Sequence, residues 1–252
     1  GGTVINSTDL TNVLYWSDRE IVVRVPGIAG PYPKTVQVNV TVGGLTSNSL
    51  PFTLLGNTPG TRPDISSITP AKGVSPDTAW DNIGTTVVIS GTDFGATQNG
   101  SVVTFTAPNG ATVNATVVAG TWSNTSITVT VPATAVTGVM RVVRTIGTSN
   151  GLIFTVLTVP TNLAVPTIGS SYAIASWYSV PGAEQYRVQV STSSTFTSPI
   201  ETITTETWAQ VNGLAANTLY YVRVRAEAPS LTPDAITKWT TTTVSFTTNP
   251  PT

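Results

Sequence analysis

The sequence predicts an all-β protein built from β-sandwiches in tandem. The dominant hydrophobic period is two, as in the segments 35–42, 101–106 and 186–191, which is the period of a half-buried strand. Turn-forming clusters such as 107–110 and 147–151 recur at short intervals, and no segment keeps a helical period beyond about one turn. Many short strands between frequent turns are typical of sandwich arrays.

A motif that occurs twice indicates how the chain is divided. Trp-Ser at the start of segment 16–26 is followed by Ile-Val-Val-Arg-Val-Pro, and the segment 122–132 repeats tryptophan, isoleucine, valine and proline at the same offsets. Each copy runs on into a closing strand, at 52–54 and 154–156 respectively. A repeat offset of about a hundred residues favours modules of common domain size.

Two junctions that contain proline, at 56–63 and 157–160, set the predicted boundaries. Both are short and stiffened by proline, which predicts an elongated multidomain rod. The first copy of the motif has fifteen residues before its tryptophan, whereas the second has about sixty strand-like residues. We therefore expect the first module to lack its opening strands, either because the chain is truncated, which we favour, or because another chain completes the sheet. The predicted parts are the C-terminal part of a module at 1–57, a linker at 58–63, a complete module at 64–157 and a third module at 159–249.

The middle module resembles the IPT/TIG immunoglobulin-like family from end to end, and residues 1–57 resemble the second half of the same module. The segments that carry the resemblance are 62–70, 86–95, the Trp122 motif and 151–156. The resemblance implies that Trp16 and Trp122 are core positions. Gly91 and Gly95 bracket a turn where a Cβ would obstruct the backbone, and Phe94 between them is expected to close the end of the sandwich.

The third module resembles a fibronectin type III domain over nearly its whole length. The segments that carry this resemblance are Ala175-Ser176-Trp177, 182–190, 214–226 and Phe246-Thr247-Thr248. It implies that Trp177 is the core tryptophan and that Tyr220 is a tyrosine corner, with a buried ring and a hydroxyl bonded to nearby backbone. Leu214 is expected to seal the same end. The Arg-Gly-Asp sequence by which some family members bind integrins does not occur in this chain.

Composition argues against several classes of function. Charged residues make up 9% of the chain and the net charge is −1, so we expect neither nucleic acid nor an anionic membrane surface as a partner. No apolar run is long enough to span a membrane, which predicts no direct membrane insertion. The chain has no cysteine and no histidine, and its scattered carboxylates form no evident acid–base pair. We therefore predict a protein that is not an enzyme and has no cofactor.

Three tryptophans are candidates for ligand contact. Trp80 lies in a loop that looks like an insertion, and Trp208 and Trp239 are expected to be partly exposed, so that each could stack on a sugar or dock a neighbour. The alternative for each is that it closes the edge of its own core. Asp77 and Asp81 flank Trp80, and their carboxylates are ligands that calcium prefers. The alternative for this pair is that both are solvated loop acids.

These features together predict a non-catalytic structural or spacer region of a larger extracellular or cell-surface protein. It would assemble or present other domains through contacts between modules, in a surface layer, filament or stalk, and its partners would be neighbouring modules or copies of itself. Threonine-rich β modules without cysteine are common on prokaryotic cell surfaces, which favours that location. The alternatives are a carbohydrate-binding or adhesin module for cell-surface glycan, and an accessory region of a secreted polysaccharide-degrading enzyme.

Overall fold

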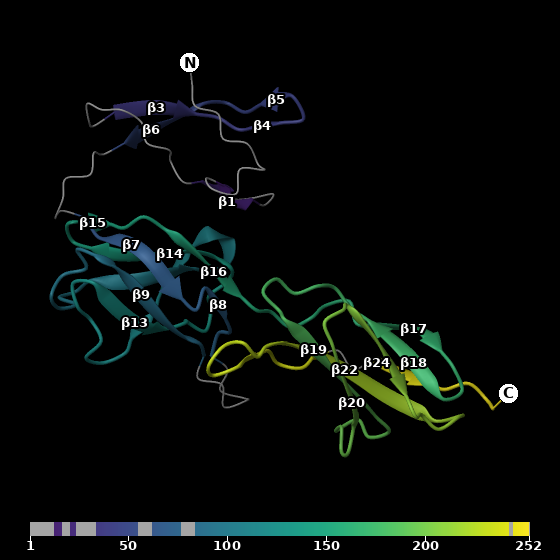
Figure 1. Cartoon of the computed structure of the whole chain (residues 1–252). Helices are drawn as coiled ribbons and strands as arrows, with labels where there is room; N and C mark the ends of the chain where they lie inside the picture. Colours follow the sequence, from purple (N-terminus) through teal and green to yellow (C-terminus); the bar gives the residue numbers. More distant parts are fainter. Residues whose placement is uncertain are drawn as a thin grey trace. The chain divides into compact units, whose positions relative to one another are not determined.

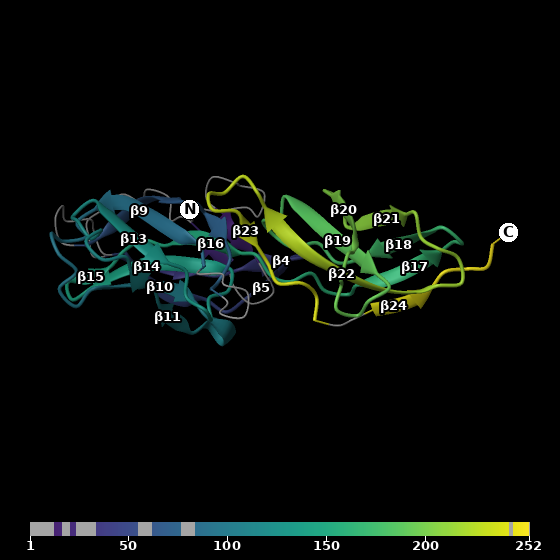
Figure 2. The same ribbon diagram turned by 90° about the horizontal axis from the view of Figure 1, so that it is seen from below.

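The computed structural model describes residues 13–16, 21–23, 34–54, 62–76, 84–241 and 244–251, and this part of the chain is all-β (Figure 1 and Figure 2). Short strands make up its regular structure, together with a 3₁₀ turn at Pro108–Gly110. The prediction of an all-β fold is therefore confirmed. The chain forms two compact units, residues 1–62 and 63–252, and each is described by itself.

The described strands of the first unit are paired two by two. β1 (Val13–Trp16) pairs with β2 (Ile21–Val23), β3 (Lys34–Val38) with β6 (Leu50–Leu54), and β4 (Thr41–Val42) with β5 (Leu45–Thr46), all antiparallel. Gly43 and Gly44 join β4 to β5 with φ values of 58° and 82°. Positive φ at both central residues is what a two-residue hairpin turn of type I′ requires.

The single strand predicted over 35–42 is two strands in the structure. β3 ends at Val38 and β4 begins at Thr41. Ser47 accounts for the break, because its amide donates to the Val40 carbonyl at 2.9 Å and its hydroxyl accepts from the Val40 amide at 3.0 Å. The chain leaves the β3–β6 pair at this point and enters the β4–β5 hairpin.

The two copies of the sequence repeat bury their closing strands to different degrees. On one face of the β3–β6 pair, Val38 lies opposite Leu50 and Val36 lies opposite Phe52. Val38, Leu50 and Phe52 are 47%, 64% and 43% exposed. Phe154, at the position in the second copy that corresponds to Phe52, is completely buried, because two sheets enclose it there.

The second unit contains two hydrophobic cores, each between two sheets. The middle sandwich has one sheet in the order β12–β13–β9–β7 and another in the order β11–β10–β14–β16–β8, with β15 paired to β14. Only β8 and β16 pair in parallel among these described strands. The strands are β7 (Asp64–Thr69), β8 (Lys72–Gly73), β9 (Thr86–Thr92), β10 (Val102–Thr106), β11 (Thr112–Asn114), β12 (Thr116–Val117), β13 (Ser126–Thr130), β14 (Gly138–Arg144), β15 (Gly147–Thr148) and β16 (Leu152–Val156).

Alternation of buried and less buried residues along β9, β13 and β14 builds much of the core of the middle sandwich. Ile89 of β9 and Ile127 of β13 lie opposite one another in the register and are both completely buried. They face Phe105 and Phe154 from the other sheet, whose rings meet edge to face with centroids 5.4 Å apart. Edge-to-face contact is a preferred geometry for aromatic pairs.

The third sandwich has a sheet of order β17–β18–β21 packed against a sheet in which β19 lies between β20 and β22. β23 and β24 both pair with β22, at opposite ends of that long strand. Two antiparallel sheets that enclose one core make this an immunoglobulin-like sandwich. The strands are β17 (Ala164–Ile168), β18 (Tyr172–Ser176), β19 (Gln185–Ser191), β20 (Ile200–Thr204), β21 (Trp208–Asn212), β22 (Leu219–Ala228), β23 (Ala235–Ile236) and β24 (Val244–Thr247).

Candidate functional site

Phe94 and Trp122 close one end of the middle sandwich together. Phe94 is completely buried, whereas Trp122 is half-buried at the rim of the core and donates from its indole N–H to the Phe94 carbonyl at 3.1 Å. Gly91 has to be a glycine, because a Cβ there would lie 2.0 Å from the Asp64 carbonyl oxygen. Trp122 was expected in the core and in fact lies at its edge, where its polar N–H finds an acceptor.

The three core positions expected in the third sandwich are buried. Trp177 packs against Tyr186 with ring centroids 5.4 Å apart, and its indole N–H has no acceptor among the described residues. The Tyr220 hydroxyl accepts a hydrogen bond from the Ala215 amide at 2.9 Å, next to the buried Leu214. This is the bond back to nearby backbone that defines a tyrosine corner.

Trp239 is buried, and the expectation that it is partly exposed is wrong. It is 6% exposed, because the guanidinium carbons of Arg223 and Arg225 lie 4.5 and 4.6 Å from its ring centroid. Arg223 is also 4.0 Å from the centroid of Phe196 on its other side. Cations over aromatic faces are attracted to the ring quadrupole, so Trp239 is held as part of the sheet's covering layer.

Two threonines hold the backbone around Trp239 against β22. The Thr237 hydroxyl accepts from the Ala226 amide at 3.0 Å, and the Thr240 hydroxyl accepts from the Val224 amide at 3.2 Å. Their own amides donate to the carbonyls of the same two β22 residues at 3.0 and 2.9 Å. Side-chain oxygens thus stand in for strand carbonyls between β23 and β24, and the irregular segment remains fixed.

A buried carboxylate lies on the same face, near the end of β22. Glu227 accepts from the Nε atoms of Arg187 and Arg225, both at 2.8 Å, and from the Gln185 amide at 2.8 Å. Burial opposes its ionisation, but the hydrogen bonds from Arg187, Gln185 and Arg225 outweigh that penalty and lower the pKa of Glu227.

The network continues to β20. Arg187 also contacts Glu201 at 3.0 Å, and the Gln189 amide donates to the same carboxylate. That bond from Gln189 is the main cause that lowers the pKa of Glu201. Arg223 donates from Nε to Gln189 at 2.7 Å. The charges on this face are therefore largely satisfied by one another, which is typical of a structural network.

Trp208 has a different environment on the other sheet of the same sandwich. It is 50% exposed and lies opposite Ser176 in the β18–β21 register. Of the three tryptophans predicted as ligand contacts, Trp208 is exposed and Trp239 is buried. Trp80, together with Asp77 and Asp81, lies outside the described residues, as does the side chain of Trp16.

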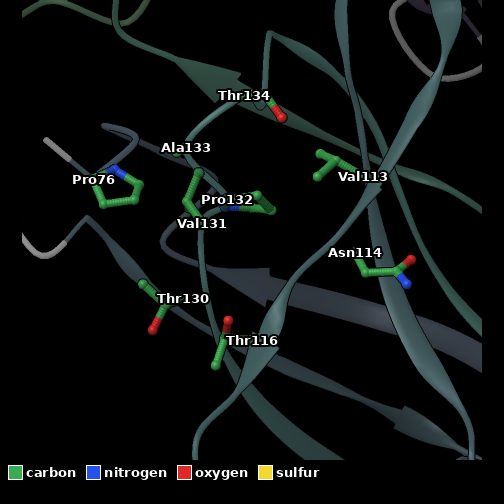
Figure 3. A pocket seen from close by; sticks show the side chains of 9 residues that line it. All are labelled: Pro76, Val113, Asn114, Thr116, Thr130, Val131, Pro132, Ala133 and Thr134. Carbon is green, nitrogen blue, oxygen red and sulfur yellow. The ribbon is translucent and has the colours of Figure 1, made fainter.

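One pocket of the middle sandwich, of about 510 Å³, is shown in Figure 3. Its lining includes both apolar side chains and side chains with hydroxyl or amide groups. Among the described residues that line it, none has a titratable side chain. Its lining residues are Pro76, Val113, Asn114, Thr116, Thr130, Val131, Pro132, Ala133 and Thr134.

The two sandwiches of the second unit are joined by side chains as well as by the chain. Val74 and Leu157 come from the middle sandwich but belong to the hydrophobic core of the third. Gly182 of the third sandwich has a φ of 82°, and a Cβ there would be 3.0 Å from a methyl group of Thr155. The positive φ favours glycine at this position, and a larger residue would press on the neighbouring sandwich.

An ion pair links the same two sandwiches beside this apolar contact. Lys72 of β8 lies 2.7 Å from Glu184, whose carboxylate also accepts from the Ser230 amide at 2.9 Å and from the Ser230 hydroxyl. The hydrogen bonds from Lys72 and Ser230 lower the pKa of Glu184 from 4.5 to about 2. We call the contact formed by Lys72, Val74, Leu157, Gly182 and Glu184 the joint.

A metal centre or a membrane-spanning helix would indicate a different function. Within the described part of the chain, no group of three or more acidic, histidine or cysteine residues could hold a metal ion. The same residues include no helix that is long and apolar enough to cross a membrane.

No protein-family model and no curated protein matches the chain. Solved structures do resemble part of it. A crystal structure described as FN3tt is 23% identical, with 38% of this chain and 97% of that chain covered and a TM-score of 0.31. The fn3 domain of human collagen alpha-1(XX) chain is 18% identical over 38% of this chain and 88% of that one, with a TM-score of 0.31. The FN5 domain of Drosophila Lar is 16% identical over 38% and 100%, also at 0.31.

Proposed function

We propose that this chain is a non-catalytic structural region of a larger extracellular or cell-surface protein, in which module-to-module contacts hold domains in fixed relation. The joint is the observation that carries this proposal. A flexible tether would leave each sandwich with a core of its own, but here Val74 and Leu157 complete the core of the neighbouring sandwich. Shared apolar burial of this kind opposes free rotation between modules.

The ion pair of the joint determines the relative orientation of the two sandwiches more than the strength of their contact. A partly exposed ion pair contributes only about 0.2–1 kcal/mol to stability, so Lys72 and Glu184 are not the main source of cohesion. Their geometry nevertheless fixes which faces meet, because Glu184 is bound by Lys72 on one sandwich and by Ser230 on the other. A spacer that must keep one orientation would use such a combination.

The identity of the modules and their location form part of the same proposal. Residues 64–157 are proposed as an IPT/TIG module, supported by the Trp122–Phe94 contact at the end of the sandwich. Residues 159–249 are proposed as a fibronectin type III module, supported by the buried Trp177 and the tyrosine corner at Tyr220. The threonine-rich composition without cysteine supports a prokaryotic cell surface. A role beside a secreted polysaccharide-degrading enzyme would require a catalytic domain in flanking sequence.

Nuclear magnetic resonance relaxation of the full chain tests the joint. We expect the two sandwiches of residues 63–252 to tumble with one common correlation time, and Leu157→Ser to separate their correlation times. Leu219→Ala is the control. Leu219 is exposed and lies at the opposite end of β22 from Glu227, which pairs with Gln185 beside Glu184 of the joint. Independent tumbling in the unmodified chain would show that the joint does not hold the modules and would overturn the proposal.

A further inference from the structure

The outer face of the β17–β18–β21 sheet is uncharged. Alternation sends Ala173, Ala175, Ala209 and Val211 into the core, so the residues between them face outward. In the register, Tyr172 lies opposite Asn212, Ile174 opposite Gln210 and Ser176 opposite Trp208. β17 adds Ala164 and Thr167 on the same side. None of these outward side chains carries a charge at neutral pH.

Two exposed aromatic rings lie at one end of this face. Trp208 is 50% exposed and Tyr178 is 63% exposed. The Trp177 amide donates to the Thr207 carbonyl at 3.0 Å, which continues the strand pairing beyond Ser176. Because Trp177 is buried, Tyr178 is on the outward side, where it is the diagonal neighbour of Trp208. Adjacent exposed aromatic rings supply the apolar surface that a ligand can stack on.

Amide groups lie next to the aromatic pair along β21. The Gln210 amide donates to the Asn212 side-chain carbonyl at 2.8 Å, which orients both groups. Among the described residues, the Gln210 carbonyl oxygen and the Asn212 amide nitrogen make no further hydrogen bond, so an acceptor and a donor are available. Trp208 and Asn212 are four residues apart on one strand, which separates them by about 13 Å.

We propose that this face, which we call the Trp208 face, binds a neutral polysaccharide chain. A sugar ring offers an apolar C–H face that stacks on an aromatic ring, and hydroxyls that pair with amides and with Ser176. An uncharged ligand suits these three strands, whose outward side chains carry no charge. An anionic ligand would lose hydration, gain no ion pair and meet Glu206, which lies opposite Tyr178 when the pairing of Trp177 with Thr207 is continued by one residue. The length of the face fits several sugar units in a row. This binding is additional to the spacer role, which rests on the joint.

A protein partner fits the Trp208 face less well. The core of a stable protein interface packs aromatic and aliphatic side chains together into complementary pockets of the partner. Here the aromatic pair is flanked by amide and hydroxyl groups. Apart from alanine, the outward residues of β18 and β21 include one aliphatic side chain, the half-buried Ile174. The Trp208 face therefore matches a hydroxyl-rich ligand.

Affinity electrophoresis of the full chain tests this proposal. The probes are soluble β-glucan, xylan and galactomannan in the gel, with pull-down on microcrystalline cellulose and chitin. We expect at least one probe to retain the chain, Trp208→Ala to weaken that binding at least tenfold, and Tyr178→Ala or Gln210→Ala to weaken it less. Trp208→Phe should restore part of the binding, since it keeps an aromatic face.

The control for these variants is Ile203→Ala, which removes a side chain of equal exposure from the other sheet and should leave binding unchanged. Thermal unfolding of each variant establishes that it is folded. The proposal is wrong if no probe retains the chain, or if Trp208→Ala binds as well as the unmodified chain. It is also wrong if Trp208→Ala abolishes self-association in sedimentation while no probe binds, because the Trp208 face would then be an interface between copies.

Discussion

The two outer faces of the third sandwich differ in how far their tryptophans are exposed. On the β20–β19–β22 side, Trp239 is covered by Arg223 and Arg225, and both carboxylates of that face are tied to its guanidinium and amide groups. On the β17–β18–β21 side, Trp208 is exposed among uncharged side chains. An outward tryptophan is therefore available to a ligand only where no neighbouring cation covers its ring. Charge placement on the strands, and not the tryptophan itself, separates a structural face from a binding face.

The largest expected difference between the faces is in the free energy of unfolding of matched tryptophan variants. Trp239→Ala removes a buried ring and should cost about 3–5 kcal/mol. Trp208→Ala removes a half-exposed ring and should cost below about 1 kcal/mol. Urea unfolding of the full chain, followed by circular dichroism, measures both. Equal losses for the two variants would contradict the division into structural and binding faces.

Removal of the buried carboxylate of Glu227 is expected to have the next largest effect. Glu227→Ala leaves Arg187 and Arg225 without their shared acceptor. Loss of one partner of a buried ion pair costs about 3–5 kcal/mol, and we expect about 2–3 kcal/mol here because the arginine side chains are about a quarter exposed. Glu206→Ala, at an exposed position, is the matched control and should stay within about 0.5 kcal/mol. A Glu227 variant as stable as this control would show that the network contributes nothing.

The two faces should also differ in their response to acid. The folded-state pKa values of Glu227 and Glu201 both lie below the ordinary 4.5. Their contribution to stability is therefore complete above that value and is lost as the pH falls through the folded-state pKa. We expect the melting temperature of the third sandwich to fall below pH 4.5, and Glu227→Gln to flatten that dependence. Binding at the uncharged Trp208 face should not change over the same range while the chain stays folded. A Glu227→Gln variant with the full acid dependence would contradict this assignment.

The smallest expected effect concerns the cation between two rings. Arg223→Lys keeps the charge but loses the planar group that stacks between Phe196 and Trp239, so we expect a cost of about 0.5–1 kcal/mol. Arg223→Met removes the charge while it keeps an apolar stem, and should cost more. If both variants lose the same stability in urea unfolding, the charge of Arg223 does not contribute.

Local pattern was sufficient to predict much of the fold. The period of two placed strands at 101–106 and 186–191, close to β10 and β19. The outward position of Trp208 follows from the same rule, since Ala209 and Val211 alternate with it into the core. The break between β3 and β4 could not be predicted in this way, because it depends on how Ser47 pairs with Val40 across a turn.

Burial of Trp239 depends on contacts with residues distant in sequence, which is why the local pattern wrongly predicted a partly exposed side chain. The segment around Trp239 has no strand period, and the two arginines that cover the ring lie on the distant strand β22. The register of β22 with β19 also brings Arg187 to the carboxylate of Glu227. The spacing Arg223, Arg225 and Glu227 at every second residue was a visible signal of one charged face. What the sequence could not show is that the pairing of distant strands would place an aromatic ring over it.

The joint has a consequence for how the chain is made. Val74 and Leu157 leave the ribosome before any strand of the third sandwich, and N-terminal domains generally fold first during synthesis. Both side chains are therefore already presented on a folded surface when the third core begins to form. We therefore expect the third sandwich to fold against the surface of the middle one, so that the two sandwiches assemble in the order in which they are synthesised.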